Sequence, residues 1–458
     1  MPTGCLREPL TGPEGIGTSS ASDDTNNGAS HDAGSDGADS AGAATEAPTT
    51  VTGGQQEPGG CGDGVVDSDE LCDDGNDLPD DGCDALCQPA PQLLWTRTHA
   101  GPAHQDDGWA DVAIGPDGRI VVVGYESDDV ISSKMQLSMF TSTGELLWER
   151  VLEGEEFTLN GLSSVRMAPD GTIFASGSRG VGSFSVFGVL LAFTTDGEPL
   201  WAFEQAAQVD RSSWIDVIDF KDGVLVSAGS DRDDISDGMG GEDQFIIVRQ
   251  HDPATGNELW KQTPMTVQPR AEPGGIAIAA GQVVVAGTTW TSLDQGRFLA
   301  AYDLAGTLLW SDEAAPESLT GWSDVRPIGD GDFVVAGVAP GDGNDFRMVL
   351  QRLGPEGEER WTYTSELGLD ILTSGVAVGP GGEIAVAASA FPEEHWHAQT
   401  LRFTSEGTLL WTSDDEGTEA LGMWGWGVAI GAGVIAVVGS EDTADIWDSN
   451  ARLRVFTQ

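Results

Sequence analysis

A tryptophan recurs along this chain at nearly constant spacing, and this repeat restricts the possible folds more than any other feature. The copies lie at positions 95, 148, 201, 260, 310, 361 and 411, so that neighbours are 50 to 59 residues apart. The preceding residue is leucine in six copies and Arg360 in the other. A period of this length, with turn residues at the same places in each copy, predicts repeated copies of one supersecondary unit.

Each unit contains turn signals that divide it into four short strands. In the first unit, the run at 111–114, the turn at 116–118 and the β-branched run at 120–123 follow one another. Four antiparallel strands per repeat predict an all-β fold, a seven-bladed β-propeller over residues 92–458. The last strand-like run, 453–456, has no tryptophan strand after it, so we expect it to pair with the first one at 93–95 and close the ring. A β-sandwich array or a solenoid is the alternative.

The repeat resembles the tryptophan-docking repeat of quinoprotein-like (PQQ-type) propellers. Its closest copy is Thr255-Gly256-Asn257-Glu258-Leu259-Trp260, and the Pro116-Asp117-Gly118 turn is similar to that of the delta-sixty class of bacterial propeller repeats. The resemblance implies a propeller and says little about function, because propellers host many unrelated activities. A quinoprotein dehydrogenase would be expected to carry adjacent cysteines, and residues 92–458 contain none. We therefore expect no quinone cofactor.

The formal net charge is −54, with 75 acidic residues against 21 basic ones. This balance excludes nucleic-acid binding, which needs clustered basic residues. Residues 1–60 are low in complexity and contain almost no large apolar side chains after Leu10, so we expect a disordered tether. No apolar run is long enough for a membrane-spanning helix.

Four of the five cysteines lie within residues 61–88, at Cys61, Cys72, Cys83 and Cys87. A segment this short needs covalent staples, and two disulfides with three possible pairings are expected. The pattern around them closely resembles the myxobacterial cysteine-rich disulfide repeat, which implies a small extracellular module. Zinc binding is the alternative, but the spacing lacks a Cys-x-x-Cys knuckle.

Carboxylates in this module suggest a calcium site. The candidate ligands are Asp63, Asp67, Asp69, Asp73, Asp74 and Asn76. A further acidic run between Asp231 and Asp243 explains the longest repeat spacing, and a solvated loop is its simpler interpretation.

The fifth cysteine, in Thr3-Gly4-Cys5, resembles the end of a bacterial lipobox, which implies lipidation of Cys5. No basic region or apolar stretch precedes it. Either the true start lies upstream or Cys5 is a free thiol. With the disulfide module and the tether, these features predict a monomeric outer-membrane lipoprotein or a secreted protein, in contact with the membrane only through a lipid anchor.

The variable loops of the predicted propeller contain the candidate binding residues. A Trp-x-Asp pattern enters the innermost strand of three blades, at Trp109 and Asp111, Trp214 and Asp216, and Trp322 and Asp324. Aromatic rings beside carboxylates suit a sugar or a cation. Packing of these rings between blades is the competing interpretation. In His395-Trp396-His397 two imidazoles share a strand face and suit metal chelation, although no third ligand is evident.

We find no nucleophile elbow, phosphate-binding loop or metalloprotease helix motif. The sequence therefore favours a non-catalytic cell-surface or secreted protein that binds an extracellular protein or glycan on its loop-rich face. A glycan lyase or hydrolase that uses the channel carboxylates, and a structural spacer of the envelope, are the alternatives.

Overall fold

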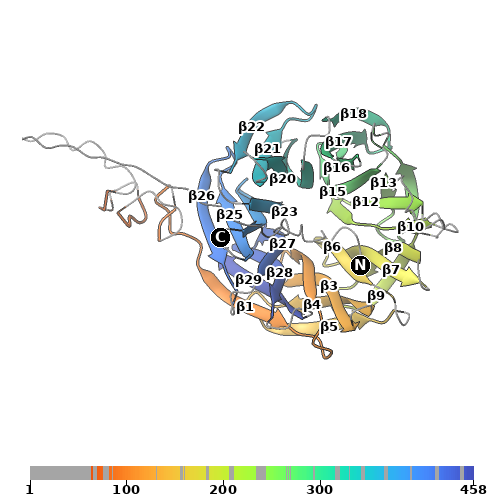
Figure 1. Ribbon diagram of the computed structural model, residues 1–458, viewed down its shortest axis with the longest axis horizontal. Coiled ribbons are helices and arrows are strands. Elements are labelled where there is room, and N and C mark those ends of the chain that lie inside the picture. The colour runs from red at the N-terminus through yellow and green to blue at the C-terminus, as the bar shows by residue number, and fades with distance from the viewer. Residues whose placement is uncertain are drawn as a thin grey trace, which may run out of the picture.

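Tight turns built around glycine join consecutive strands into antiparallel sheets, and the sheets surround a common centre in the computed structural model (Figure 1). The structure describes residues 63–64, 66, 70–75, 82–84 and 86–458, except for residues 130–131, 155–157, 159, 182–184, 206–210, 234–243, 265, 267, 269, 292–293, 315–319, 330, 342–345, 366–369, 392–394, 418–421 and 444–447. The predicted tether and most of the acidic run at 231–243 lie outside the described residues. Within them, no helix is both long and apolar enough to cross a membrane.

We number the blades along the chain. Blade 1 contains β2 (Gly108–Ile114), β3 (Ile120–Asp129), β4 (Ser132–Phe140) and β5 (Leu146–Leu152). Blade 2 contains β6 (Gly161–Met167), β7 (Ile173–Val181), β8 (Ser185–Phe193) and β9 (Pro199–Glu204). Blade 3 contains β10 (Arg211–Ser213), β11 (Val217–Lys221), β12 (Val224–Asp233), β13 (Gln244–His251) and β14 (Glu258–Gln262). Blade 4 contains β15 (Arg270–Ala279), β16 (Gln282–Trp290), β17 (Gln295–Asp303) and β18 (Leu308–Glu313).

The remaining blades follow the same pattern. Blade 5 contains β19 (Gly321–Ile328), β20 (Asp332–Pro340), β21 (Phe346–Leu353) and β22 (Glu359–Thr364). Blade 6 contains β23 (Asp370–Val378), β24 (Ile384–Phe391), β25 (His397–Phe403) and β26 (Leu409–Asp415). Blade 7 contains β27 (Met423–Gly431), β28 (Val434–Asp442), β29 (Ser449–Thr457) and β1 (Leu93–His99).

The innermost strands form a closed circuit. They contact one another in the order β2, β6, β11, β15, β19, β23 and β27, and β27 contacts β2 again. Blades 3 and 4 share one continuous sheet only through a single parallel bridge between Gln244 and Arg270. This arrangement confirms the prediction of an all-β propeller.

The ring closes by pairing the two ends of the repeat region, as the sequence predicts. β1 is antiparallel to β29, with Leu93 opposite Phe456 and Trp95 opposite Val455. The backbone of Gln92 and that of Thr457 extend this pairing through a bond from the Thr457 N–H to the Gln92 carbonyl, at 2.9 Å. Blade 7 is therefore built from both ends of the propeller.

The hydrophobic core lies between neighbouring blades. Between blades 1 and 2, for example, Val121 and Leu137 pack with Val165 and Ile173, and all four are fully buried. Strands covered on both faces need apolar side chains on both faces, which explains the continuous β-branched runs in the repeat.

The repeated tryptophans bind each blade to the next. The Trp201 indole donates to the Pro253 carbonyl at 3.0 Å, in the turn of the following blade. Gly256 of that turn has a φ of 73°, and a Cβ on it would lie 2.4 Å from the Trp201 ring. The other docked tryptophans are Trp95, Trp148, Trp260, Trp310 and Trp361. Glycine in the turn is thus required both for its backbone conformation and for the close approach of the ring.

Trp411 is the exception, because the corresponding turn of blade 7 is where the two chain ends meet. It packs edge-on against Phe456 at 5.3 Å instead, and both it and Leu410 are 4% exposed. The equivalent leucines of five other blades are 44–57% exposed. Ala90, just after the cysteine module, packs against the same cluster. The end of the module therefore covers an edge that solvent reaches in other blades.

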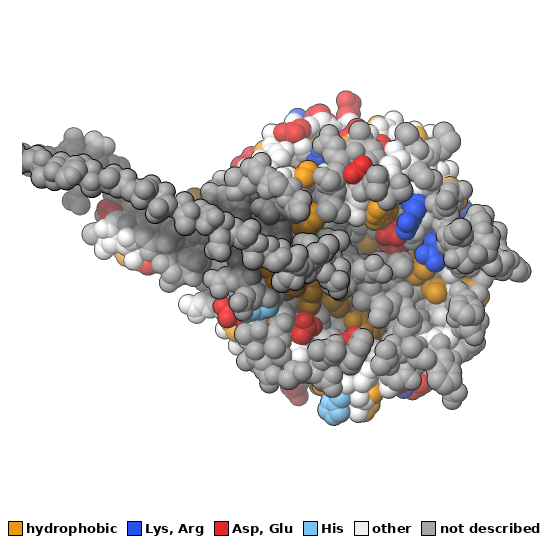
Figure 2. Space-filling view, viewed as in Figure 1, with side chains coloured by type: hydrophobic (Ala, Val, Ile, Leu, Met, Phe, Trp, Pro, Cys, Tyr) orange, Lys and Arg blue, Asp and Glu red, His pale blue; other side chains and the backbone are white. Residues whose placement is uncertain are grey.

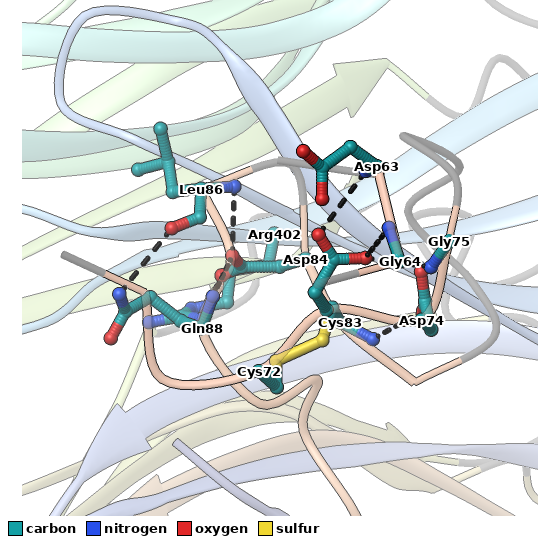
Figure 3. The surroundings of a disulfide bond; sticks show 11 residues. Asp63, Gly64, Cys72, Asp74, Gly75, Cys83, Asp84, Leu86, Gln88 and Arg402 are labelled. Carbon is teal, nitrogen blue, oxygen red and sulfur yellow. Dashed lines mark hydrogen bonds and ion pairs between the residues drawn. A yellow bond between two sulfur atoms is a disulfide. The ribbon is translucent and has the colours of Figure 1, made fainter. Parts of the chain in front are cut away.

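The cysteine module is held to β25 by a buried ion pair (Figure 3). Asp84 is 2% exposed, and one of its carboxylate oxygens accepts a bond from Arg402 at 3.3 Å. Its other oxygen accepts the backbone N–H groups of Leu86 and Gln88, at 2.9 and 3.0 Å. Asp84 thus orders the module's own turn and links it to blade 6.

A disulfide joins Cys72 and Cys83, which confirms part of the predicted framework. Cys87 is also disulfide-bonded, while Cys61 and Cys5 lie outside the described residues. Of the predicted calcium ligands, Asp73 accepts the backbone N–H groups of Gly64 and Gly75 and Asp74 accepts that of Cys83. These carboxylates therefore already have structural hydrogen bonds. Asp67, Asp69 and Asn76 lie outside the described residues.

Candidate functional site

Charged side chains gather on the innermost strands, which surround the centre of the propeller. Pairing with the second strand places Arg166, Asp219 and Arg326 at equivalent positions of blades 2, 3 and 5. Blades 1, 4, 6 and 7 have alanine at this position, at 113, 277, 377 and 429. We refer to Asp111, Arg166, Asp219, Asp324 and Arg326 as the central charge cluster. Figure 2 shows hydrophobic and acidic side chains between the grey segments over the middle of this face, and basic side chains to their right.

Each carboxylate of this cluster accepts a backbone N–H from the next blade. Asp111 accepts the Val165 N–H at 2.9 Å, Asp219 accepts that of Ile278 at 2.8 Å and Asp324 accepts that of Val376 at 3.0 Å. These three bonds join blade 1 to 2, blade 3 to 4 and blade 5 to 6. The aspartates therefore fasten innermost strands to one another.

The two arginines neutralise these carboxylates. Arg166 lies 3.0 Å from Asp111 and 3.5 Å from Asp219, and Arg326 lies 3.0 Å from Asp324. Burial alone would lower the pKa of Arg166, but Asp111, Asp219 and Asp324 raise it above the ordinary value. Burial lowers the pKa of Arg326, and the charge of Arg166 adds to that effect. The cluster is thus a buried, mutually paired set of charges that no single motif reveals in the sequence.

The three predicted Trp-x-Asp pairs are not structurally equivalent. Trp109 lies opposite Gly124, and Trp322 lies opposite Gly337. The equivalent glycine of blade 3 is Gly229, but the Trp214 N–H donates to the carbonyl of the next residue, Ser230. The blade 3 motif is therefore shifted by one residue. Because successive residues of a strand point to opposite faces, Asp216 does not take the place of Asp111 and Asp324.

All six of these predicted residues are buried. The Trp109 indole donates to Gln136 at 3.1 Å and packs edge-on against Phe140. Arg232 lies over the Trp214 ring and Arg297 over the Trp322 ring, at 5.8 and 5.0 Å from the ring centres. The rings thus pack within the protein, as in the competing interpretation, and ligand binding by these residues stays a prediction.

Asp216 has an unusual electrostatic environment. Burial, and then the nearby Glu272 carboxylate, raise the pKa of Asp216 to about 8, although the Ser230 hydroxyl donates to it at 3.3 Å. Glu272 itself accepts a bond from Gln244 at 2.7 Å. Asp216 is therefore a proton-carrying carboxyl at neutral pH, next to an acceptor of the neighbouring blade.

We expect this proton to make stability depend on pH between about 6.5 and 8. The unfolded aspartate is ionised there and the folded one is not, so the stability contribution is complete below the unfolded pKa and is lost as the pH rises through about 8. The free energy of unfolding should fall by up to ~1.4 kcal/mol per pH unit. Burial lowers the pKa of His251 to about 4, which makes stability rise with pH. This opposite effect is confined to pH values below the pKa of an unfolded histidine.

Chemical unfolding at pH 6.5, 7.2 and 8 measures this dependence. The Asp216→Asn variant mimics the protonated carboxyl and should be nearly flat over the same range. An equal slope in the variant and the parent chain would show that another group is responsible.

A second candidate surface is formed by half-buried aromatic side chains. Trp396 stacks on Trp424 at 4.8 Å and contacts Phe391 at 5.3 Å, and Tyr125 stacks on Trp426 at 6.4 Å. We call these five residues, from blades 6, 7 and 1, the aromatic patch. Gly108 makes room for it, because a Cβ there would lie 2.6 Å from the Trp426 ring.

Carboxyl groups lie beside the aromatic patch. The Trp424 side chain donates a hydrogen bond to Asp442, whose pKa is raised, chiefly by burial. Asp106 interacts with Asp442 across blades 7 and 1, and burial raises its pKa as well. Half-buried rings with adjacent carboxyl groups are a combination that suits sugar rings, through stacking on one face and hydrogen bonds at the edge.

The repeat pattern does not join Trp424 and Trp426 to Trp396, because the two segments belong to different repeats. The sequence does mark one part of the patch, because β27 of blade 7 contains two tryptophans, Trp424 and Trp426.

Comparison with known proteins identifies one family, described as a domain of unknown function (DUF4215), whose profile matches residues 60–88. No curated protein matches the chain. Among solved structures, a protein of unknown function from Dyadobacter fermentans is 11% identical, with 81% of this chain and 100% of that chain covered and a TM-score of 0.49.

Two other solved structures are similar at the same level. The β-propeller domain of the Trilobed protease from Pyrococcus furiosus is 10% identical, covering 74% of this chain and 92% of that chain with a TM-score of 0.45. Drosophila Plexin A in complex with Semaphorin 1b is also 10% identical, covering 80% and 87% with a TM-score of 0.45. Identities this low carry no information on function, because one fold hosts many activities.

Proposed function

We propose that this protein is a non-catalytic binding protein of the cell surface or exterior, and that the aromatic patch binds a carbohydrate. The observation that carries the proposal is the half-buried Trp396–Trp424 stack, whose rings lie 4.8 Å apart beside the carboxyl of Asp442. Apolar patches at a protein surface mark interaction sites, and large aromatic rings grouped there suit a ligand that covers them.

The central charge cluster supports a binding role over a catalytic one. Each of its carboxylates has both an arginine and a backbone N–H as partners, so none is a free acid or base. Releasing one of these carboxylates would leave a buried arginine without its ion-pair partner, which is unfavourable. The cluster therefore supports a rigid ring on which variable loops are held.

The cysteine module supports an extracellular location. Disulfides such as Cys72–Cys83 persist in oxidising compartments and are rare in the cytosol. Lipidation of Cys5 would attach the protein to the outer membrane, and mass analysis of the protein from its native host tests this directly.

A glycan array probed with the full chain tests the proposed ligand class. We expect binding that Trp424→Ala weakens at least about fivefold, or ~1 kcal/mol, through loss of ring stacking. Phe245→Ala is the matched control, because Phe245 is an aromatic residue outside the patch that is 36% exposed. Equal affinity of Trp424→Ala and the parent chain, or binding only to a protein, would overturn the carbohydrate assignment.

A glycan-active enzyme is the second candidate, favoured by one observation. Asp216 holds a proton near neutral pH beside Glu272, as a general acid and its partner would. Analysis of bound glycans for shortened or unsaturated products distinguishes this candidate. Products that disappear with Asp216→Asn would establish it in place of simple binding.

A further inference from the structure

The end of the β25–β26 hairpin brings together three side chains with metal-binding atoms. Pairing places Gln399 opposite Asp414 and Ala398 opposite Asp415. Continuing the register by one residue puts Glu416 opposite His397. Asp414 and Glu416 share one face because they are two residues apart. The sequence motif His395-Trp396-His397 thus gains two carboxylates from the neighbouring strand.

The distances suit a shared ion. One ligand atom from each of His397, Asp414 and Glu416 lies within 4.8 Å of the others, and His397 Nδ1 is 2.8 Å from the Asp414 carboxylate. Zinc binds histidine nitrogen and carboxylate oxygen at about 2.0–2.2 Å, so its ligand atoms must lie about 3–4 Å apart. Small side-chain rotations therefore suffice to bring the three atoms around one centre.

His395 gives a second, independent indication. Its ring lies 4.8 Å from the His397 ring, and its Nε2 atom is buried with no hydrogen-bond partner among the residues that the structure describes. A buried polar atom without a partner destabilises the folded state, and metal ligation would remove that loss. The short distance between the rings and the unpartnered nitrogen together make His395 the candidate fourth ligand.

The surrounding charges leave these ligands available. Asp415, on the opposite strand face, pairs with Arg452 and Arg454, each at 3.2 Å. Arg452 also contacts Glu441 at 2.5 Å. The nearby arginines are therefore held by other carboxylates, and the exposed Asp414 and Glu416 remain on the side of the imidazoles.

We propose that His395, His397, Asp414 and Glu416 bind one divalent transition metal ion, zinc being the best match to two imidazoles and two carboxylates. The ion would fix the ends of the segment that carries Trp396. Because Trp396 stacks on Trp424, metal binding would hold one edge of the aromatic patch in place. The site itself does not depend on the patch having a ligand.

Titration calorimetry of the chelator-treated full chain with zinc chloride tests this site. We expect one ion per chain, with a dissociation constant that His397→Ala raises at least a hundredfold and Glu416→Gln about tenfold. Glu416 is exposed, so its variant should fold normally, and an unchanged thermal midpoint without metal checks this. His104→Ala and Glu406→Gln are matched controls, an exposed histidine and an exposed carboxylate elsewhere, which should bind zinc as the parent chain does.

Cobalt provides a readout of the ligands. Cobalt(II) in the parent chain should give visible absorption bands that weaken or shift in His395→Ala. Zinc binding of equal strength in the parent, His397→Ala and Glu416→Gln chains would place the ion elsewhere, for instance at the carboxylates of the cysteine module, and would overturn the inference. Absence of stoichiometric binding by the parent chain would overturn it as well. Neither result decides the glycan assignment, which is tested separately by comparing Trp424→Ala with the parent chain on the glycan array.

Discussion

Replacing Asp111 by alanine should lower the free energy of unfolding by about 3 kcal/mol or more. The change removes an acceptor for Val165 N–H, the Ser164 hydroxyl and Arg166 together, at 2.9, 3.0 and 3.0 Å. Removing one partner of a buried ion pair leaves an uncompensated buried charge, which strongly destabilises the folded state. Of its two ion pairs among the described residues, Arg166 then keeps the longer one, to Asp219 at 3.5 Å, so we expect the loss to reach blades 2 and 3.

Thermal and denaturant unfolding measure this effect. Asp117→Ala is the matched control, because Asp117 also pairs with an arginine, Arg119 at 2.6 Å, but on the surface. Exposed pairs contribute at most about 1 kcal/mol, so the control should change little. Asp111→Asn should lie between the two, since it keeps an oxygen for the backbone N–H. If Asp111→Ala is no more destabilising than Asp117→Ala, the central charge cluster does not hold the blades together.

Replacing Asp84 by alanine should release the cysteine module from blade 6. The variant loses the bond to Arg402 and those to the N–H groups of Leu86 and Gln88. Hydrogen bonds to a charged group contribute about 1.5–3 kcal/mol each, and the Arg402 charge would be left half-buried without this partner. We expect a lower thermal midpoint and exposure of Leu410 and Trp411.

Limited proteolysis and tryptophan fluorescence detect this release. Cleavage should appear between the module and β1, and the emission should shift to the red as water reaches Trp411. Asp63→Ala is the control, because Asp63 belongs to the same module and is exposed. Identical cleavage patterns for the Asp84→Ala and parent chains would mean that the packing around Ala90 alone holds the module.

The repeat predicts the architecture well because it records local chemistry. A tryptophan such as Trp201 and a glycine such as Gly256 are needed in every blade for the same contact, so their spacing reveals the blade. The closure of the ring also follows, since the strand at 453–456 lacks a partner in the sequence and finds it in β1.

The central charge cluster was not predictable from the same pattern. Arg166 and Arg326 occupy positions that hold alanine in other blades, so nothing in one repeat marks them. The shared Trp-x-Asp pattern also hides that Trp214 is not structurally equivalent to Trp109. The entry to β11 differs by one residue from the other blades, and a one-residue shift is invisible in a spacing but reverses the strand face.

The metal ligands show the same limit. His395 and His397 stand out in the sequence, but Asp414 and Glu416 are two acids among 75. Only the register of β25 and β26 selects them, and that register includes an irregularity between Arg402 and Phe403.

The place where the ring closes has a mechanical consequence. A pulling force applied to the chain ahead of the cysteine module reaches the propeller through that module. It meets the disulfide-bonded module and its Asp84–Arg402 contact before it can separate β1 from β29. Blade 7 is the one sheet that tension at the amino-terminal side can open by removing a strand. A protein pulled from that side would thus bear load on blade 6 before the pairing of β1 with β29 is loaded.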